Sequence, residues 1–141
     1  MRLSVLVVSR TAKLVNRLNR SLAVATQIDK SEVEVLISWN GNATDEANIN
    51  QNWPYCIRII SRDEYHFARN INTLAKEAKG EILLIINDDV VLDSKSIDNG
   101  IKTLTSVPNA GLVGARLRTT AGLISHDGVG FTNDNSAYNL F

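Results

Sequence analysis

The sequence predicts an α/β fold in which a mainly parallel sheet is flanked by helices. Short runs of β-branched and aliphatic residues alternate along the chain with longer segments whose apolar residues recur at helical spacing. Residues 82–86, Ile-Leu-Leu-Ile-Ile, are apolar throughout, which is typical of an inner strand that helices cover on both faces. Parallel strands need crossover connections, and the helical segments between the runs supply them.

Length and composition indicate one globular domain over residues 1–141. A chain of 141 residues lies within the usual size of a single domain, and 44% of it is hydrophobic. Its 15 basic and 15 acidic residues balance, so no net charge favours nucleic acid or a membrane surface as a partner. The longest apolar runs are about five residues, far shorter than a membrane span requires.

The cellular compartment is predicted from the cysteine content and from the first residues. The single cysteine, Cys56, cannot form an internal disulfide, and its apolar surroundings in the sequence place it in the core. The apolar run at residues 3–8 is too short for a signal peptide, and no cleavage-site pattern follows it. We therefore expect a reduced, cytoplasmic environment.

The first part of the chain alternates between strand and helix signals. The apolar residues of 12–25 fall on one helical face, and Thr11 precedes them as an N-cap. An Asn40-Gly41 step marks a turn after the second strand. In chain order we expect a strand over 3–8, a helix over 12–25, a strand over 33–38, a short helix over 44–51 capped by Thr44, and a strand over 55–60.

The second part continues the alternation and then loses it. Gly80 stands where a C-terminal cap belongs, and Pro108 lies just beyond the end of the last helix. In chain order we expect a helix over 67–79, the apolar strand, a helix that Ser94 caps, a strand over 110–118, and a hairpin turn over 119–122 leading into 123–125. The Asn-rich tail, 131–141, has no pattern that predicts an element.

Polar residues gather where the predicted parallel strands end. Ligands of open α/β sheets bind beyond the carboxyl ends of the strands, and here those ends release Ser9, Trp39, Ser61 and Asn87. Asp88 and Asp89 follow the apolar strand directly. Adjacent carboxylates repel each other, and hard divalent cations favour oxygen ligands, so the pair predicts a metal site. A polar turn that only caps the strand would use the same residues.

Two common nucleotide-binding classes are disfavoured because their motifs are missing. No Gly-x-Gly-x-x-Gly follows the first strand, and no Gly-x-x-x-x-Gly-Lys-Ser/Thr is present. The two histidines, His66 and His126, lack the spacing of metal ligands. A dinucleotide-dependent dehydrogenase and a P-loop NTPase are therefore disfavoured.

Five short motifs occur in a characteristic order. They are Ser9-Arg10-Thr11, Trp39-Asn40-Gly41-Asn42, Phe67-Ala68-Arg69-Asn70, Ala78-Lys79-Gly80-Glu81 and Asn87-Asp88-Asp89. This ordered set resembles the inverting family 2 glycosyltransferases of the Rossmann-like GT-A sandwich fold. Residues 113–117 and 121–129 are also similar to the segment that follows in rhamnosyltransferase-like members. The resemblance covers roughly residues 3–131.

The resemblance implies a nucleoside-diphosphate sugar as the ligand and inverting glycosyl transfer as the reaction. Asn87-Asp88-Asp89 matches the DXD-type signature, in which Asp89 would ligate Mn²⁺ or Mg²⁺ and Asp88 would reach the ribose or share the metal. The nucleotide-sugar-binding residues that it implies are Ser9, Trp39, Asn40, Arg69 and Asp88.

Two departures from the family pattern leave alternatives open. Trp39 stands where the family usually has a base-recognising aspartate, and Asp45 is out of step with that position; Trp39 either stacks on a base or belongs to the core. The acidic general base of the acceptor half does not appear before Phe141, so we expect a donor-binding part with no catalytic residue of its own. The apolar surface that the acceptor half would cover predicts a homo-oligomer.

Two other functions compete with the glycosyltransferase interpretation. A non-catalytic nucleotide-sugar-binding or assembly module would keep the fold without the acceptor site. A nucleotidyltransferase would share the sandwich, but it is disfavoured because no glycine-rich basic loop follows the first strand.

Overall fold

The computed structural model describes residues 2–140, which form two compact units divided between Asp98 and Asn99. The first unit contains a four-stranded parallel sheet with helices, and the second contains two short antiparallel pairs of strands. The α/β fold with a mainly parallel sheet is therefore confirmed.

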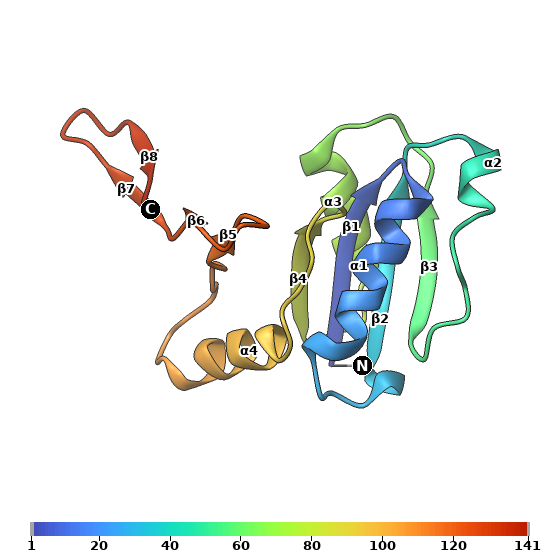
Figure 1. The fold of residues 1–141 in the computed structure, drawn as a ribbon, viewed down its shortest axis with the longest axis horizontal. Helices are drawn as coiled ribbons and strands as arrows, with labels where there is room; N and C mark the ends of the chain where they lie inside the picture. Colours follow the sequence, from blue (N-terminus) through green and yellow to red (C-terminus); the bar gives the residue numbers. More distant parts are fainter. Residues whose placement is uncertain (1, 141) are drawn as a thin grey trace. The chain divides into compact units, whose positions relative to one another are not determined.

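The parallel sheet has the strand order β3-β2-β1-β4 (Figure 1). Its strands are β1 (Leu3–Ser9), β2 (Val33–Trp39), β3 (Cys56–Ser61) and β4 (Ile82–Asn87). All seven residues of β1 and all seven of β2 are buried, so these two strands form the centre of the unit. β1 pairs with β4 in register from Leu3–Ile82 to Val8–Asn87, which aligns the carboxyl ends of the two strands.

The expectation that residues 82–86 form an inner strand is wrong. β4 pairs with β1 alone among the strands of this sheet, and Leu83 and Ile85 are 43% and 53% exposed. An uninterrupted apolar run identifies a strand, but it carries no information about which strands lie beside it. The strands with both faces covered are β1 and β2.

The two long helices of the first unit cover opposite faces of the sheet (Figure 1). α1 (Ala12–Ala25) buries Val15, Leu18 and Leu22, as its apolar periodicity predicts. α3 (Phe67–Glu77) buries Ile71 and Leu74 against Leu6 and Val8 of β1 and Leu36 of β2. Side chains alternate between the faces of a strand, so each central strand contributes to both layers of core.

Two predicted helix ends differ from the structure for local reasons. α2 (Ala43–Glu46) is shorter than the expected helix over 44–51, and its N-cap is Asn42, whose Oδ1 accepts from the Asp45 N–H at 2.7 Å. α3 ends at Glu77, and its C-cap is Ala78 in an extended conformation. Gly80 therefore has a different role: a Cβ there would lie 2.5 Å from the backbone nitrogen of Ser4.

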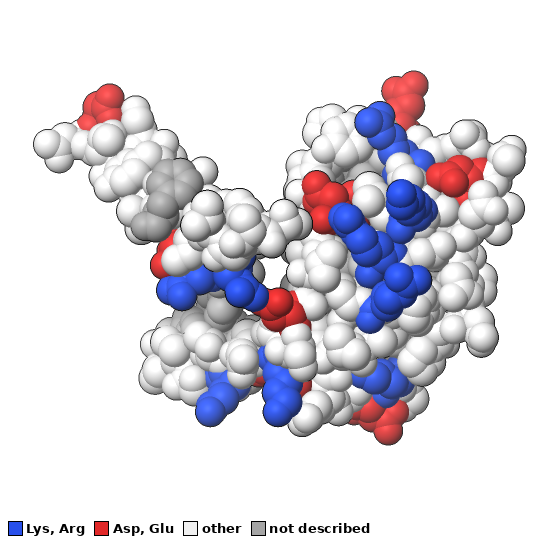
Figure 2. All heavy atoms as spheres, viewed as in Figure 1, with Lys and Arg blue, Asp and Glu red and all other residues white. Residues whose placement is uncertain are grey.

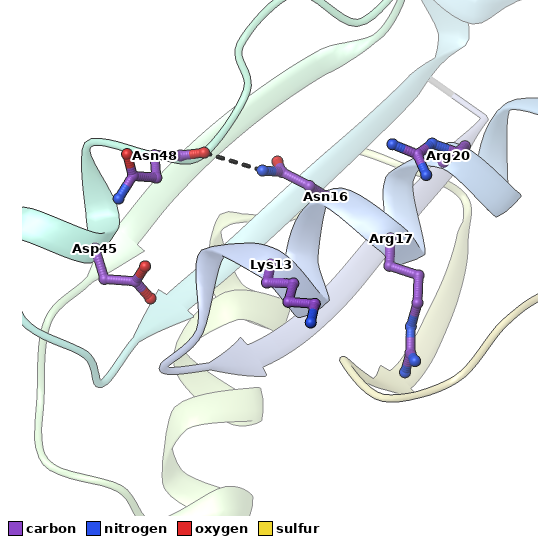
Figure 3. Close-up of a pocket in the computed structure, with 6 residues that line it drawn as sticks. All are labelled: Lys13, Asn16, Arg17, Arg20, Asp45 and Asn48. Atoms are coloured by element: carbon purple, nitrogen blue, oxygen red, sulfur yellow. Dashed lines mark hydrogen bonds between the residues drawn. The ribbon is translucent and has the colours of Figure 1, made fainter.

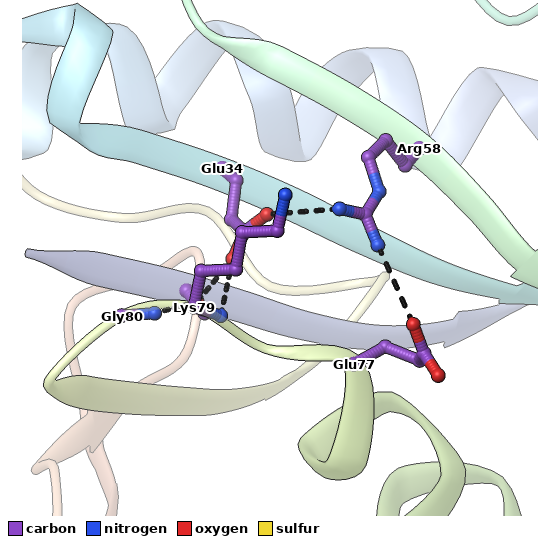
Figure 4. A network of polar contacts seen from close by, with 6 residues as sticks. Glu34, Arg58, Glu77, Lys79 and Gly80 are labelled. Atoms are coloured by element: carbon purple, nitrogen blue, oxygen red, sulfur yellow. Dashed lines mark hydrogen bonds and ion pairs between the residues drawn. The ribbon is translucent and has the colours of Figure 1, made fainter. Parts of the chain in front are cut away.

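A buried carboxylate holds the segment between α3 and β4 against the sheet (Figure 4). Glu34 of β2 is 1% exposed, and its Oε1 accepts from the Ser4 hydroxyl at 2.7 Å and from the Lys79 N–H at 2.8 Å. The Ser4 hydroxyl accepts from the Gly80 N–H at 2.8 Å, and Arg58 of β3 lies 3.7 Å from Glu34 Oε2. This network joins β1, β2 and β3 to the entry of β4.

The remaining elements include a helix that crosses the boundary of the units and two hairpins. They are a 3₁₀ turn η1 (Lys30–Glu32), α4 (Ser96–Ser106), β5 (Leu117–Arg118), β6 (Ile124–His126), β7 (Val129–Phe131) and β8 (Ala137–Asn139). The expected strand over 110–118 is reduced to β5, whereas the predicted hairpin is confirmed, with Gly122 in its turn at φ +83°. The β7–β8 hairpin was not predicted.

Two further observations concern the compartment and the membrane. Cys56 is exposed, which corrects the expectation that it lies in the core; it is the first residue of β3, a strand at the edge of the sheet. Among residues 2–140, no helix has the length and apolar character needed to cross a membrane.

The exposed face of β4 leads to a prediction about assembly. Unpaired strand edges and bare apolar side chains promote association, so we expect the chain to form a dimer or larger species at about 10–50 µM. Ile85→Lys should shift it toward monomer, because a charge on β4 opposes burial of that face. Light scattering measures the mass of the species in solution. The matched control is Val107→Lys, which adds the same charge at a residue that directly follows α4 and is 50% exposed. A wild-type monomer over this range would contradict the prediction.

Candidate functional site

Ser9 and Asp88 meet at the carboxyl edge of the sheet. Ser9 ends β1, Asp88 follows β4, and the Ser9 hydroxyl donates to Asp88 Oδ2 at 2.6 Å. The contact follows from the register, because the preceding residues of the two strands, Val8 and Asn87, are partners in the parallel pair. Ser9 Oγ also accepts from the Thr11 N–H at 3.2 Å. The structure thus brings together two residues that were predicted from separate motifs to bind the nucleotide sugar.

Asp89 differs from Asp88 in its surroundings. Asp88 is half-buried and held by Ser9, whereas Asp89 is exposed. The Asp89 backbone carbonyl accepts from Arg17 Nη2 of α1 at 2.6 Å. The turn after β4 is therefore fixed on two sides, through the Asp88 side chain and through the Asp89 main chain. Nothing in the sequence indicated this contact, because Arg17 lies outside the apolar face of the helix and no motif includes it.

The fit of a divalent cation depends on this pair of carboxylates. Residues 2–140 contain no group of three or more His, Cys, Asp or Glu side chains placed to hold a metal ion. Mg²⁺ is commonly held by one or two carboxylates together with water and the phosphates of a substrate. An exposed Asp89 beside a half-buried Asp88 suits that arrangement, in which the cation is bound together with a phosphate ligand, and does not suit a metal site built entirely from protein.

Trp39 belongs to the core, which is one of the two alternatives that the sequence left open for it. It is 1% exposed, and its indole N–H donates to the Asn42 carbonyl at 3.2 Å. A Cβ on Gly41 would lie 2.5 Å from the indole ring, so the turn after β2 closes directly over it. The buried ring presents no face on which a base can stack in this structure.

Asn40 lies beside the Ser9 end of the site. Its backbone N–H donates to the Ser9 carbonyl at 2.7 Å, and its side-chain Nδ2 donates to the Asp63 carbonyl. The Asn40 Oδ1 is buried and has no hydrogen-bond partner among the described residues. Leaving a buried polar atom unpaired costs about 1–3 kcal/mol, so a donor that reached this acceptor would relieve that cost.

Arg69 and Asn70 begin α3, where His66 provides the cap. His66 Nδ1 accepts from the Arg69 N–H at 3.3 Å, and Asn70 Oδ1 accepts from the His66 N–H at 2.6 Å. This contact gives the Asn70 side chain a structural role at the start of α3, while its Nδ2 stays buried and unpaired among the described residues. Arg69 is exposed, and no hydrogen bond or ion pair within residues 2–140 joins it to Ser9 or Asp88.

Two charged groups near the strand ends are committed to the fold. Asp45 Oδ2 accepts from the Ala12 N–H at 2.9 Å and so stabilises the start of α1. Arg62, which follows β3, donates to both carboxylate oxygens of Glu46 at 2.8 and 2.6 Å. These hydrogen bonds lower the pKa of Glu46 and raise the pKa of Arg62. The Arg62 guanidinium is therefore paired already.

His126 and Asp127 belong to the second unit. His126 Nδ1 lies 3.2 Å from Asn139 Oδ1, and Asp127 accepts from Arg116 at 2.7 Å, a hydrogen bond that raises the pKa of the arginine. Both residues are thus engaged within the hairpin region.

The comparisons with known proteins agree on the class. A family model described as glycosyl transferase family 2 matches residues 4–124. The O-antigen biosynthesis protein RfbC of Myxococcus xanthus is 29% identical over 119 residues, which are 82% of this chain and 9% of RfbC.

Solved structures show the same fold. The crystal structure of S. aureus TarS 1–349 in complex with UDP has a TM-score of 0.59 at 20% identity, and the match covers 84% of this chain and 40% of that one. A second crystal structure of S. aureus TarS has a TM-score of 0.56 at 20% identity, with 74% and 20% covered. The chain therefore spans less than half the length of each of these relatives.

Proposed function

We propose that this chain, which belongs to glycosyl transferase family 2, binds a nucleoside-diphosphate sugar as the donor for inverting glycosyl transfer. The observation that carries the proposal is the turn after β4. It presents one anchored and one exposed carboxylate at the carboxyl edge of a parallel sheet, where ligands of open α/β sheets bind.

The residues of the site divide into three roles. Asp89 would hold Mn²⁺ or Mg²⁺, which supplies positive charge to the diphosphate leaving group when bound. Asp88, fixed by Ser9, would bind the ribose, because its second carboxylate oxygen remains free to accept from a hydroxyl. Asn40 would accept from the nucleotide through its unpaired Oδ1.

An exposed arginine in the first turn of α3 supports the same assignment. Arg69 is exposed in the first turn of α3, where its charge opposes the helix dipole, and a diphosphate would offset that repulsion.

The carboxylates assigned to the donor would lie on the side of the leaving diphosphate. The base that takes the acceptor's proton therefore lies outside this set of residues.

A cytoplasmic location is part of the proposal. Cys56 is a free and exposed thiol, and such thiols persist in reducing compartments. Nucleoside-diphosphate sugars would reach the site from the same aqueous phase.

Calorimetric titration tests the proposed function. UDP is the first ligand to use, because the related TarS structure contains it. We expect UDP to bind in Mn²⁺ and to bind about 100-fold more weakly in EDTA, whereas uridine should show no such dependence because it lacks the diphosphate. Equal affinity for UDP in Mn²⁺ and in EDTA would overturn the metal role, and failure to bind UDP, ADP, GDP and dTDP would overturn the donor-binding role.

A further inference from the structure

The exposed face of α1 carries positive charge and no negative charge. Lys13, Arg17 and Arg20 are all exposed, and residues 12–25 contain no aspartate or glutamate. The whole chain has equal numbers of basic and acidic residues, so this face is a local departure from a neutral composition. Figure 2 shows Lys and Arg side chains gathered over α1 on this side of the first unit.

The three basic residues form a line along the helix. At about 100° per residue, positions 13, 17 and 20 fall within an arc of roughly 60°, and position 24 lies in the middle of the same arc. The rise of the helix places Lys13 and Arg20 about 10 Å apart along its axis. Position 24 is Val24, which is 61% exposed. We call Lys13, Arg17, Arg20 and Val24 the α1 stripe.

A groove of about 490 Å³ runs beside the α1 stripe (Figure 3). Its lining consists of Lys13, Asn16, Arg17, Arg20, Asp45 and Asn48. Asn16 links the two segments that line it, because its Nδ2 donates to the Asn48 carbonyl at 2.9 Å. The groove is therefore a fixed feature of the first unit, where α1 meets the segment after α2.

The positive charges of the α1 stripe have no ion-pair partner in the described part of the chain. Arg17 donates to the backbone carbonyl of Asp89, which is a neutral acceptor. Asp45, the one acidic residue in the lining of the groove, accepts from the Ala12 N–H. Basic groups outnumber acidic groups in the groove by three to one.

We propose that the α1 stripe docks the first unit on the surface of an anionic membrane. A straight row of cations on long aliphatic stems matches a plane of lipid phosphates, with the stems lying in the headgroup layer and the charged ends reaching the phosphates. The exposed Val24 continues the row and adds an apolar contact. The docking is peripheral and involves no membrane-spanning helix.

The composition of the groove favours a lipid surface over a single-stranded nucleic acid. Proteins that bind single strands stack bases on aromatic side chains, and no aromatic residue lines this groove. The two tryptophans are elsewhere: Trp39 is buried in the core, and the ring of Trp53 is parallel to that of Tyr55, with centroids 6.1 Å apart.

Co-sedimentation of the full chain with vesicles tests this proposal. We expect binding to vesicles of phosphatidylglycerol and phosphatidylcholine, and none to pure phosphatidylcholine. Each basic residue near an anionic surface strengthens binding about fivefold, so Lys13→Gln with Arg20→Gln should weaken it about 25-fold. Salt at about 0.5 M should release the wild-type chain, because the Debye length falls below about 5 Å.

A matched double variant controls for net charge. Lys76→Gln with Lys102→Gln removes two exposed lysines from α3 and α4, and it should bind anionic vesicles as the wild type does. Circular dichroism verifies that both double variants are folded.

The outcomes separate the α1 stripe from its alternatives. Absence of binding to anionic vesicles, or an equal loss of binding in both double variants, would overturn the proposal. Release of the chain from vesicles by a single-stranded oligonucleotide at micromolar concentration would overturn it in favour of nucleic acid. Vesicle binding is measured without nucleotide, so its result is independent of the donor-binding test.

Discussion

Replacing Glu34 with alanine is expected to lower the free energy of unfolding of the first unit by about 2–4 kcal/mol. Glu34 is 1% exposed and accepts two hydrogen bonds through Oε1, from the Ser4 hydroxyl and from the Lys79 N–H. Removing a buried acceptor leaves its donors without partners, at about 1–3 kcal/mol for each group. Alanine would also leave a cavity beside the entry to β4, where Gly80 already lies against the backbone of β1.

A glutamine at the same position separates the hydrogen bonds from the charge. Glu34→Gln retains an oxygen that can accept both bonds, and it loses the ion pair with Arg58, whose side chain is 29% exposed. An ion pair at 3.7 Å and in partial contact with solvent contributes little, so the expected loss is below about 1 kcal/mol. If the charge were the main contribution, Glu34→Gln and Glu34→Ala would be destabilised equally.

Urea unfolding followed by tryptophan fluorescence measures both variants. Trp39 and Trp53 are the two tryptophans of the chain, and both belong to the first unit, so the signal reports on that unit. The change in midpoint, at an unchanged dependence on urea, gives the change in stability. A Glu34→Ala midpoint equal to that of the wild type would show that the network adds nothing to the fold.

The centre of the first unit was predictable because its sequence pattern and its burial agree. β1 and β2 are mainly apolar and are buried along their whole length, and α1 has one continuous apolar face, so each matches a single template. Their ends agree with the prediction to within about one residue, which is the usual ambiguity of such boundaries.

The place of β4 in the sheet was not predictable from its composition. Residues 82–86 are apolar without interruption, whereas each central strand contains two polar residues, yet Leu83 and Ile85 are 43% and 53% exposed. Strand order depends on contacts between distant segments, which local hydrophobicity does not encode. Gly80 shows the same limit: its position after a helix suggested a cap, whereas its close approach to Ser4 involves a residue far away in the chain.

Local chemistry explains the misses at α2 and in the tail. Asn42 and Thr44 are both good N-caps by residue type, and the structure uses Asn42, one of the stronger capping types. The tail looked featureless, yet it folds back between Phe131 and Ala137, with Asn135 at φ +64°. Asn and Asp favour such turns, so the run Asn133-Asp134-Asn135 was the available signal.

The candidate site was predictable as a set of positions and not as a set of contacts. The carboxyl ends of parallel strands share one edge, which located Ser9 and Asp88 before their hydrogen bond was known. The support of Asp89 by Arg17 could not be inferred, because it joins residues 72 positions apart through a backbone carbonyl. The role of Trp39 could not be predicted either, because a buried indole and a base-stacking indole look alike in a sequence.

Replacing Asp89 with asparagine is expected to weaken the binding of UDP in Mn²⁺ by about 100-fold, to the level measured in EDTA. A bound cation contributes several kcal/mol to holding a phosphoryl oxygen, and the charge of Asp89 is what would retain it at the site. The change is local, because Arg17 contacts the Asp89 backbone carbonyl, which asparagine keeps. The turn after β4 should therefore hold its shape while it loses one carboxylate.

Asp88→Asn is the matched variant, because it removes the same charge from the neighbouring residue. Its amide oxygen can still accept from the Ser9 hydroxyl, so the anchor of the turn remains. With Asp89 intact, the variant should bind UDP more weakly than the wild type and should still bind more tightly in Mn²⁺ than in EDTA. Calorimetry in both conditions distinguishes the two residues. If Asp88→Asn abolished the Mn²⁺ dependence and Asp89→Asn preserved it, the half-buried carboxylate beside Ser9 would be the metal ligand, and the roles proposed for the two aspartates would have to be exchanged.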